Sequence, residues 1–315
     1  MQKVIVTGAN GFVGYWLIKE LMKHSIKVIA IVKDTNEKID MLTSLSGVSI
    51  VYCNLSNMIN LDTIIPDRGF DAFYHLAWIS AGGSGRADYN LQLMNAKYAC
   101  DAVIVAKKLN CKKILVAGTI TEKIASQTLV LPVKSNNIIY GIAKHTTHCM
   151  LEILTNRLNL EFVWMQFSNL YGPYSINGNI VGYTIKEILE GRNAIFGTAQ
   201  QPYDLLYIED LVYAAYLLGE KDVKRTCYYL GSGNPKILKD YLIRIGELCG
   251  NPDAIKIGAR ADDGLKYDLE WFDASALIED TGYMPRISFD QGVLNTINCL
   301  SSTYKCNFLG ADNKQ

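Results

Sequence analysis

The stretch Val4-Ile5-Val6-Thr7-Gly8-Ala9-Asn10-Gly11-Phe12-Val13-Gly14 decides the fold class of this chain. It begins as a β-branched strand, turns at a glycine and leads into apolar residues at helical spacing. Gly8 permits a tight turn, Gly11 lets backbone N–H groups approach a pyrophosphate, and Gly14 lets the helix pack against the strand. The positive end of the helix dipole then faces the diphosphate. The stretch predicts a dinucleotide-binding turn, with a tight strand-to-helix turn that binds no ligand as the alternative.

Short apolar runs alternate with helical patterns through the first half of the chain. Continuous runs predict strands at 28–32, 48–52, 72–76, 114–116 and 162–165, separated by helices such as 91–109. Strands that are apolar throughout are typical of a parallel sheet covered on both faces. We therefore predict an α/β fold with a doubly wound parallel sheet, a Rossmann domain over residues 1–168 to which roughly 204–230 return. A smaller, interleaved C-terminal α+β substrate domain is expected over 169–315.

Composition excludes several classes of protein. The 315 residues are 49% hydrophobic and 20% charged, which is enough for a sizeable core, and 31 basic residues balance 31 acidic ones. Zero net charge without a basic block argues against nucleic-acid binding. The most apolar stretch, 72–81, is interrupted by His75 and is too short to span a membrane. Eight scattered cysteines without CxxC spacing are typical of reduced thiols, so we expect a soluble cytoplasmic protein.

The GxxGxxG spacing of the first turn resembles the extended short-chain dehydrogenase/reductase family of NAD(P)-dependent nucleotide-sugar epimerases, dehydratases and reductases. Further matches extend to about residue 297, and they are His75-Leu76-Ala77, Gln92 with Asn95, Tyr140-Gly141-Ile142-Ala143-Lys144, Asn169-Leu170-Tyr171-Gly172-Pro173, Asp204 with Asp210, and Gly282-Tyr283-Met284-Pro285. The resemblance implies a nicotinamide cofactor and a nucleotide-sugar substrate.

Tyr140 and Lys144 form the predicted catalytic pair, because they lie one helical turn apart on the same face. A neighbouring ammonium favours the phenolate, so the pair can give a proton to a carbonyl oxygen as hydride arrives, or take one from an alcohol. Tyr15 and Lys19 share the spacing, but Tyr140 follows a strand that ends at Gly118-Thr119, and open α/β sheets bind ligands at such ends. An ordinary core tyrosine is the alternative for Tyr140.

The resemblance also assigns the neighbours of this pair. Thr119 occupies the family's Ser/Thr position, which hydrogen-bonds the substrate oxygen, with Thr121 as the fallback. Family dehydratases carry Asp-Glu directly after that position, where this chain has Ile120-Thr121, and Glu122 falls one residue late. Isoleucine cannot act as an acid, so dehydration is disfavoured.

The end of the second strand bears on the cofactor. The position of the NAD-binding acid is Val32, followed by Lys33, whose charge suits the 2′-phosphate of NADP. Asp34 would bind NAD if the strand ran two residues further, so NADP(H) is favoured and NAD(H) is the alternative. The predicted cofactor-binding residues are Gly8, Asn10, Gly11, Phe12, Val13, Gly14, Lys33, Asn54, Leu55, Leu76, Ala77, Tyr140 and Lys144.

The glycine-rich segment 78–86 follows a strand end and is expected to lie over the sugar, with Trp78 and Ser80 in contact with it. By resemblance, Asn169 hydrogen-bonds the diphosphate or sugar. Arg260 pairs with the diphosphate or is simply solvated. Asn95 is expected to order the active-site helix through backbone hydrogen bonds.

Histidines and helices give two further expectations. His145, His148 and Cys149 lack zinc-ligand spacing, and His75 suits a structural role beside the cofactor, so no metal is expected. Helix 91–109 and the helix after Tyr140 are long enough for the four-helix homodimer interface that the resemblance suggests.

Together these features predict an NADPH-dependent reductase of a nucleotide-activated 4-keto-6-deoxy sugar, with Tyr140 as the proton donor. An NAD-retaining nucleotide-sugar 4-epimerase is the same-fold alternative. A non-catalytic dinucleotide-binding protein is the alternative from another class.

Overall fold

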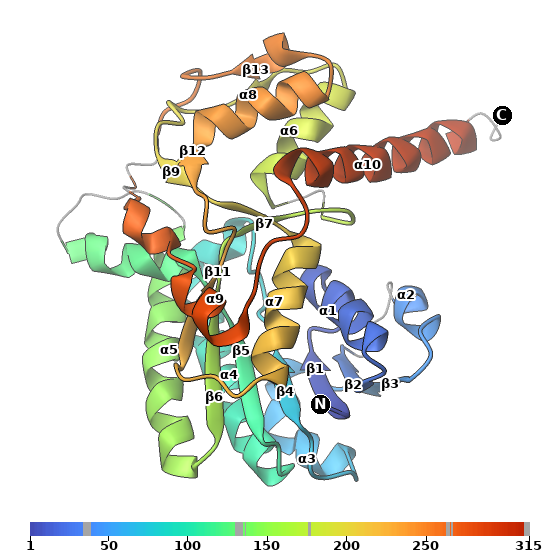
Figure 1. Cartoon of the computed structure of the whole chain (residues 1–315), viewed down its shortest axis with the longest axis vertical. Helices are drawn as coiled ribbons and strands as arrows, with labels where there is room; N and C mark the ends of the chain where they lie inside the picture. The colour runs from blue at the N-terminus through green and yellow to red at the C-terminus, as the bar shows by residue number, and fades with distance from the viewer. Residues whose placement is uncertain are drawn as a thin grey trace. The chain divides into compact units, whose positions relative to one another are not determined.

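The computed structural model describes residues 1–33, 39–129, 135, 137–175, 178–262, 265 and 267–311, as two compact units (Figure 1). The first unit comprises Met1–Phe167, Leu211–Leu230 and Ala274–Tyr283, and the second comprises Ser168–Asp210, Gly231–Asp273 and Met284–Gln315. The sequence analysis returned roughly 204–230 to the first unit and did not foresee the return of 274–283.

Local pairing explains both differences. Strand β10 (Leu205–Tyr207) pairs with β7 (Asn169–Tyr171). This pairing keeps residues 204–210, which were expected in the first unit, within the second unit. Helix α9 (Ser275–Thr281) packs against strand β11 (Cys227–Leu230) of the first unit. The Lys221 ammonium donates to the Thr281 carbonyl at 2.6 Å and adds a polar contact to the same arrangement.

A seven-stranded parallel sheet forms the first unit, in the order β11-β6-β5-β4-β1-β2-β3, which confirms the predicted doubly wound Rossmann class. Its strands are β1 (Lys3–Thr7), β2 (Lys27–Val32), β3 (Val48–Tyr52), β4 (Ala72–His75), β5 (Lys113–Thr119), β6 (Glu161–Phe167) and β11 (Cys227–Leu230). The helices of this unit are α1 (Phe12–Lys23), α2 (Asp40–Thr43), α3 (Leu61–Ile64), α4 (Tyr89–Lys108), α5 (Asn137–Leu158), most of α7 (Ile208–Glu220) and α9, with 3-10 turns η1 (Leu55–Asn60), η2 (Ser84–Ala87) and η3 (Ile120–Leu129).

Both faces of this sheet are apolar because helices cover both of them. Ile5, Phe73 and Trp164 point to one face and join a buried cluster with Ala99 of α4 and Leu151 of α5. Figure 1 shows α4 and α5 along this face and α1 and α7 along the other. The alternation of side chains along each strand therefore divides one continuous apolar run between two cores.

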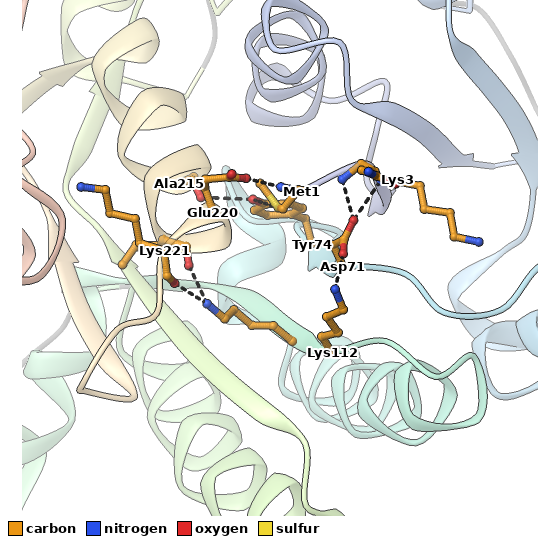
Figure 2. Close-up of polar contacts among 11 residues, drawn as sticks. Met1, Lys3, Asp71, Tyr74, Lys112, Ala215, Glu220 and Lys221 are labelled. Carbon is orange, nitrogen blue, oxygen red and sulfur yellow. Dashed lines mark hydrogen bonds and ion pairs between the residues drawn. The ribbon is translucent and has the colours of Figure 1, made fainter.

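Polar contacts tie down the amino-terminal edge of the sheet (Figure 2). The Asp71 carboxylate, just before β4, accepts from the Lys3 backbone N–H at 3.2 Å and from the Lys112 ammonium at 2.7 Å. The Tyr74 hydroxyl donates to the Ala215 carbonyl of α7 at 3.3 Å. Burial raises the pKa of Asp71, but the hydrogen bond from Lys112, the backbone donors and the lysine charge outweigh it and lower the pKa to about 2.

We expect Asp71→Asn to lower the free energy of unfolding by about 1–2 kcal/mol at pH 7, because the bound carboxylate is lost. A lowered carboxyl pKa stabilises the fold above the unfolded-state pKa of about 4, and this contribution disappears as pH falls toward 2. Urea denaturation at pH 7 and pH 3 measures both effects. The exposed Asp67 provides the control Asp67→Asn. An equal loss in both variants, or a D71N deficit that persists undiminished at the lower pH, would contradict the assignment.

The second unit has three short strand pairs, β7 with β10, β8 (Ala194–Ile195) with β13 (Ile255–Lys256), and β9 (Pro202–Tyr203) with β12 (Lys236–Ile237). Its helices are α6 (Ile180–Leu189), α8 (Leu238–Leu248) and α10 (Phe289–Ala311), with 3-10 turns η4 (Pro252–Ala254) and η5 (Leu269–Phe272). The Gln291 N–H donates to the Ser288 hydroxyl at 3.3 Å, so Ser288 caps the last helix. Within the described part of the chain, no helix combines the length and apolarity needed to cross a membrane.

Candidate active site

A pocket of about 380 Å³ opens at the carboxyl edge of the large sheet, where β1 and β4 end at Thr7 and His75. Nine predicted site residues line it, namely Gly8, Asn10, Gly11, Lys33, Leu55, Leu76, Ala77, Trp78 and Ser80. Of the other predicted cofactor residues, Phe12, Val13 and Gly14 lie in α1, and Asn54 is exposed before η1. Sequence analysis missed the buried wall of Ile31, Cys53 and Met58. Asp34 lies outside the described residues.

Glycine is required where the turn meets the rest of the pocket. Gly8 has φ +67°, and a Cβ there would lie 3.0 Å from the backbone N and Cα of Ala77. A Cβ at Gly14 would lie 2.1 Å from the Gly8 carbonyl oxygen, so α1 can approach the turn only without a side chain. Larger residues at these positions would displace the backbone that shapes the pocket.

The amino terminus of α1 has the features of a phosphate site. Gly11 caps the helix without a side-chain hydrogen bond, and the first turn of α1 holds no acidic residue. The first backbone N–H groups of a helix are therefore not satisfied by a capping side chain, and its dipole favours an anion. Together with the glycine cradle, this terminus fits the diphosphate of a dinucleotide.

We expect Gly8→Ala to weaken dinucleotide binding at least tenfold and to destabilise the fold by about 1–3 kcal/mol, because strain and a backbone clash combine. Gly69 is the matched control, since it has φ +73° and no atom within 4 Å of the place that a methyl group would take. Gly69→Ala should show the strain alone, with dinucleotide affinity unchanged. Calorimetric titration with NAD(H) and NADP(H), alongside thermal unfolding, separates the two effects. Equal affinity in G8A and wild type would contradict the cradle.

His75 is held in a neutral state beside this pocket. It is buried, its Nδ1 lies 3.0 Å from the Thr7 hydroxyl, and that hydroxyl accepts from the Ala77 N–H at 3.3 Å. Burial, with a smaller contribution from the Lys144 charge, lowers the pKa of His75 to about 3. A neutral imidazole that orders the ends of β1 and β4 fits the structural role predicted for it.

Tyr140, Lys144 and Thr119 come together at the end of β5. Thr119 ends this strand, and its side chain shares a hydrogen bond with Tyr140, whose side chain is almost fully buried. The buried Lys144 ammonium donates to the Ala117 carbonyl at 2.6 Å. The Thr119 hydroxyl also donates to that of Thr121, at 3.1 Å, so both candidate threonines belong to one network.

Contacts between lysines and aromatic rings distinguish the two tyrosine–lysine pairs. Lys19 lies over Trp16 at 4.5 Å and Tyr15 at 5.6 Å, along α1, and neither member of the competing Tyr15/Lys19 pair lines the pocket. Lys144 lies 3.6 Å from the ring centroid of Trp78 but 6.0 Å from that of Tyr140. The Lys144 ammonium therefore lies closer to the ring of Trp78 than to the ring of Tyr140.

Burial changes the acidity of both members of the predicted pair. Desolvation raises the pKa of Tyr140, while the charge of Arg86 and the hydrogen bond between Tyr140 and Thr119 oppose that rise. Desolvation lowers the pKa of Lys144 to about 7, where the Glu122 carboxylate favours the charged ammonium and Arg86 disfavours it. Lys144 therefore loses its proton far more readily than an exposed lysine does.

Arg86 was not among the predicted site residues, and the structure places it over the ring of Tyr140. Its guanidinium carbon lies 4.4 Å from the ring centroid of Tyr140. The signal in the sequence was a cation in a glycine-rich segment after a strand end, but such segments carry solvated arginines as well. Arg86 is brought to the ring of Tyr140 by the packing of η2 against α5, which the sequence does not reveal.

Glu122 is the second residue that sequence analysis left without a role. It is buried and accepts hydrogen bonds from Trp164 Nε1, at 2.9 Å, and from the Gln166 side chain. His148 stacks on Trp164 with ring centroids 4.6 Å apart, and its Nδ1 lies 3.6 Å from the Glu122 carboxylate. Glu122, one residue beyond the positions of the dehydratase acids, is therefore held in a hydrogen-bond network inside the protein.

Asn95 orders a different segment from the one predicted. Its amide donates to the Ile79 carbonyl and accepts from the Ile79 N–H, both at 2.9 Å. Gln92 accepts from Trp78 Nε1 at 2.8 Å and donates to the Gly85 carbonyl at 2.9 Å. Both α4 side chains thus hold the segment after β4, because that segment passes directly over them, and the prediction that Asn95 orders the active-site helix was wrong.

The remaining predicted residues belong to the second unit. The Asn169 side chain donates to the Asp204 carbonyl at 3.2 Å, and Arg260 is exposed, with its backbone N–H bound to Phe196. Their roles as substrate ligands stay predictions. Among the described residues, no group of three His, Cys, Asp or Glu side chains is arranged to hold a metal ion.

The fold and this site define a dinucleotide-dependent enzyme class. The NAD dependent epimerase/dehydratase family matches residues 4–231, so the chain belongs to that family and is an enzyme of its type.

Particular relatives are more distant. The chain is 27% identical over 246 residues to dTDP-6-deoxy-L-talose 4-dehydrogenase (NAD(+)) of Aggregatibacter actinomycetemcomitans, covering 75% of this chain and 86% of the relative. It is 26% identical to dTDP-4-dehydro-6-deoxyglucose reductase of Escherichia coli, over 94% of this chain and 98% of that protein. The UDP-glucose 4-epimerase of Thermotoga maritima shares the fold, with a TM-score of 0.79 at 22% identity, over 96% of this chain and all of that one (100%).

Proposed function

We propose that this protein is an NADPH-dependent reductase of a nucleotide-activated 4-keto-6-deoxy sugar. The observation that carries the proposal is Tyr140, hydrogen-bonded to Thr119 at the carboxyl end of β5, without a free acid at the adjacent positions. Ile120 and Thr121 occupy the positions where a dehydratase needs acids, and Glu122 is bound to Trp164 and Gln166. The names of both relatives above denote redox chemistry at position 4 of a dTDP-linked 6-deoxy sugar, which supports net reduction over dehydration.

The residues of the site contribute to this reaction in different ways. Gly8, Gly11 and the other residues of the pocket would hold the reduced nicotinamide cofactor, which would provide the hydride for the C4 carbonyl carbon. Tyr140 gives its proton to the carbonyl oxygen, which becomes the C4 hydroxyl. Thr119 orients that oxygen beside the phenol, and a charged Lys144 stabilises the phenolate that remains. Trp78 and Ser80, on the pocket wall, are proposed to contact the sugar.

NADP(H) is the proposed cofactor because of the wall near the end of β2. Val32 and Lys33 line the pocket there, Val32 is buried, and Lys33 is exposed. An aliphatic side chain offers nothing to the 2′-hydroxyl of NAD, and a lysine can pair with the 2′-phosphate of NADP. NAD(H) is the alternative, supported by the relative whose name specifies NAD(+).

We expect the purified protein to oxidise NADPH, faster than NADH, with one member of a panel of nucleotide-linked 4-keto-6-deoxy sugars. Tyr140→Phe should lower kcat by about 100- to 10,000-fold because the proton donor is lost. Tyr15→Phe, at the competing tyrosine, is the control and should retain activity. Loss of absorbance of the reduced nicotinamide measures the rate.

Three outcomes would contradict the reductase proposal. Tightly bound NAD with sugar interconversion in the absence of added cofactor would establish the 4-epimerase instead. Dinucleotide binding without turnover across the panel would favour a non-catalytic protein. Equal activity of Tyr140→Phe and wild type would remove the proposed proton donor.

The proposal includes a homodimer built from α4 and α5, which pack side by side. Their outer faces carry exposed apolar side chains, including Leu93 at 64%, Met150 at 41% and Ile153 at 64% exposure. A second copy of the same helix pair would cover this face and complete a four-helix bundle.

We expect Ile153→Glu to convert a dimer into a monomer, because a carboxylate would be buried at the centre of the apolar face. Leu269→Glu, at a residue 62% exposed in the second unit, is the control and should leave the dimer intact. Sedimentation velocity measures both variants. A wild-type protein that sediments as a monomer at micromolar concentration would contradict this interface.

A further inference from the structure

Two side chains from the segment after β4 enclose the ring of the catalytic tyrosine. The Arg86 guanidinium carbon lies 4.4 Å from the Tyr140 ring centroid, and the Trp78 ring meets it edge-on, with centroids 6.2 Å apart. Only 5% of Tyr140 is exposed. Arg86 is only partly exposed, and a cation this close to the face of a buried aromatic ring is attracted to it more strongly than to a ring in water.

Arg86 is held in this place by its own segment. Its Nε donates to the Ala81 carbonyl at 2.6 Å, and Gln92 binds the neighbouring Gly85 carbonyl. A Cβ at Gly85 would lie 2.4 Å from the Ser80 side chain, so the segment folds this tightly only with glycine there. The guanidinium is thus fixed by backbone contacts that do not depend on the tyrosine.

The charged groups that face Tyr140 differ in how strongly their charge depends on pH. Among the described residues they are Arg86, Lys144 and Glu122, with His75 neutral nearby. Lys144 is farther from the ring, at 6.0 Å, lies against Trp78 and loses its proton near neutral pH. Arginine keeps its charge at every pH that the fold survives.

We propose that Arg86 is a positioning residue, whose fixed charge over the ring stabilises the phenolate of Tyr140 and so makes this tyrosine an effective proton donor. Lys144 then contributes mainly packing and a hydrogen bond to the site, and its charge supplies only part of the stabilisation of the phenolate. The proposal rests on the proposed function for the part that Tyr140 plays, but the acidity of the phenol can be measured without any substrate.

The test is a titration of Tyr140 in protein labelled with ¹³C at the tyrosine Cζ, with Tyr140→Phe to assign the resonance. Arg86→Gln should raise the phenol pKa by about one unit, a tenfold change in the ionisation constant, and Arg86→Lys should restore most of it. If the substitution merely loosened the segment, water would enter and the pKa would fall toward its ordinary value near 10. The direction of the shift therefore separates a charge effect from a structural one.

The variant Lys144→Met tests the competing hypothesis that Lys144 sets the pKa of the phenol. A larger rise of the phenol pKa in this variant than in Arg86→Gln would overturn the proposal and return the tuning to the lysine. If the phenol stays protonated until the protein unfolds, the ¹⁵N resonance of Lys144 reports on the same cation near pH 7. Arg86→Gln should raise the Lys144 pKa and Arg86→Lys should leave it unchanged. An unchanged value in both variants would also overturn the proposal.

Activity supplies a second readout. In the reductase assay, Arg86→Gln should lower kcat about tenfold with little change in KM for the sugar, and its basic pH limb should move to higher pH. Arg192→Gln, which breaks an exposed ion pair with Glu187, is the matched control. If Arg86→Gln shifts the phenol titration but the protein reduces none of the sugars, the role of Arg86 stands and the proposed function fails. If the protein reduces a sugar but the titration does not shift, the proposed function stands and the role of Arg86 fails.

Discussion

The close approach of α1 to the end of β1 is the constraint on which the rest of the first unit depends. It exists because Gly8 adopts a left-handed conformation and because Gly14 has no side chain to meet the Gly8 carbonyl oxygen. This approach places a helix terminus that has no side-chain cap at the carboxyl edge of the sheet. Because neighbouring parallel strands end at that same edge, Thr7, His75 and Thr119 gather there from segments far apart in the chain.

Desolvation controls the chemistry of the gathered residues. It keeps His75 neutral, raises the pKa of Tyr140 and brings the pKa of Lys144 to about 7. A tyrosine and lysine at helical spacing would suggest one cation serving one phenol, but the buried lysine contacts Trp78 more closely than it contacts the tyrosine. The packing therefore does not pair this lysine with this phenol in the way that the sequence spacing alone suggests.

A second polar network lies behind the proposed proton donor. Glu122 accepts from Trp164 and Gln166, and its charge acts on both Tyr140 and Lys144. Gly118 is required here, because a Cβ on it would lie 2.3 Å from Trp164 Nε1. The two donors thus hold this carboxylate inside the protein, where its charge opposes that of the nearby cations.

Much of the fold and part of the site followed from the sequence alone. Strand and helix patterns around Gly8 determined the doubly wound sheet, because periodicity and glycine conformation are local properties. The Tyr140–Lys144 spacing and the end of β5 at Thr119 followed for the same reason. Arg86 over the phenol, the inner bonds of Glu122, the clamp of Asn95 on Ile79 and the return of 274–283 to the first unit were decided only by tertiary structure. Each depends on which side chains meet across elements and how much water they exclude, and no local pattern carries that information.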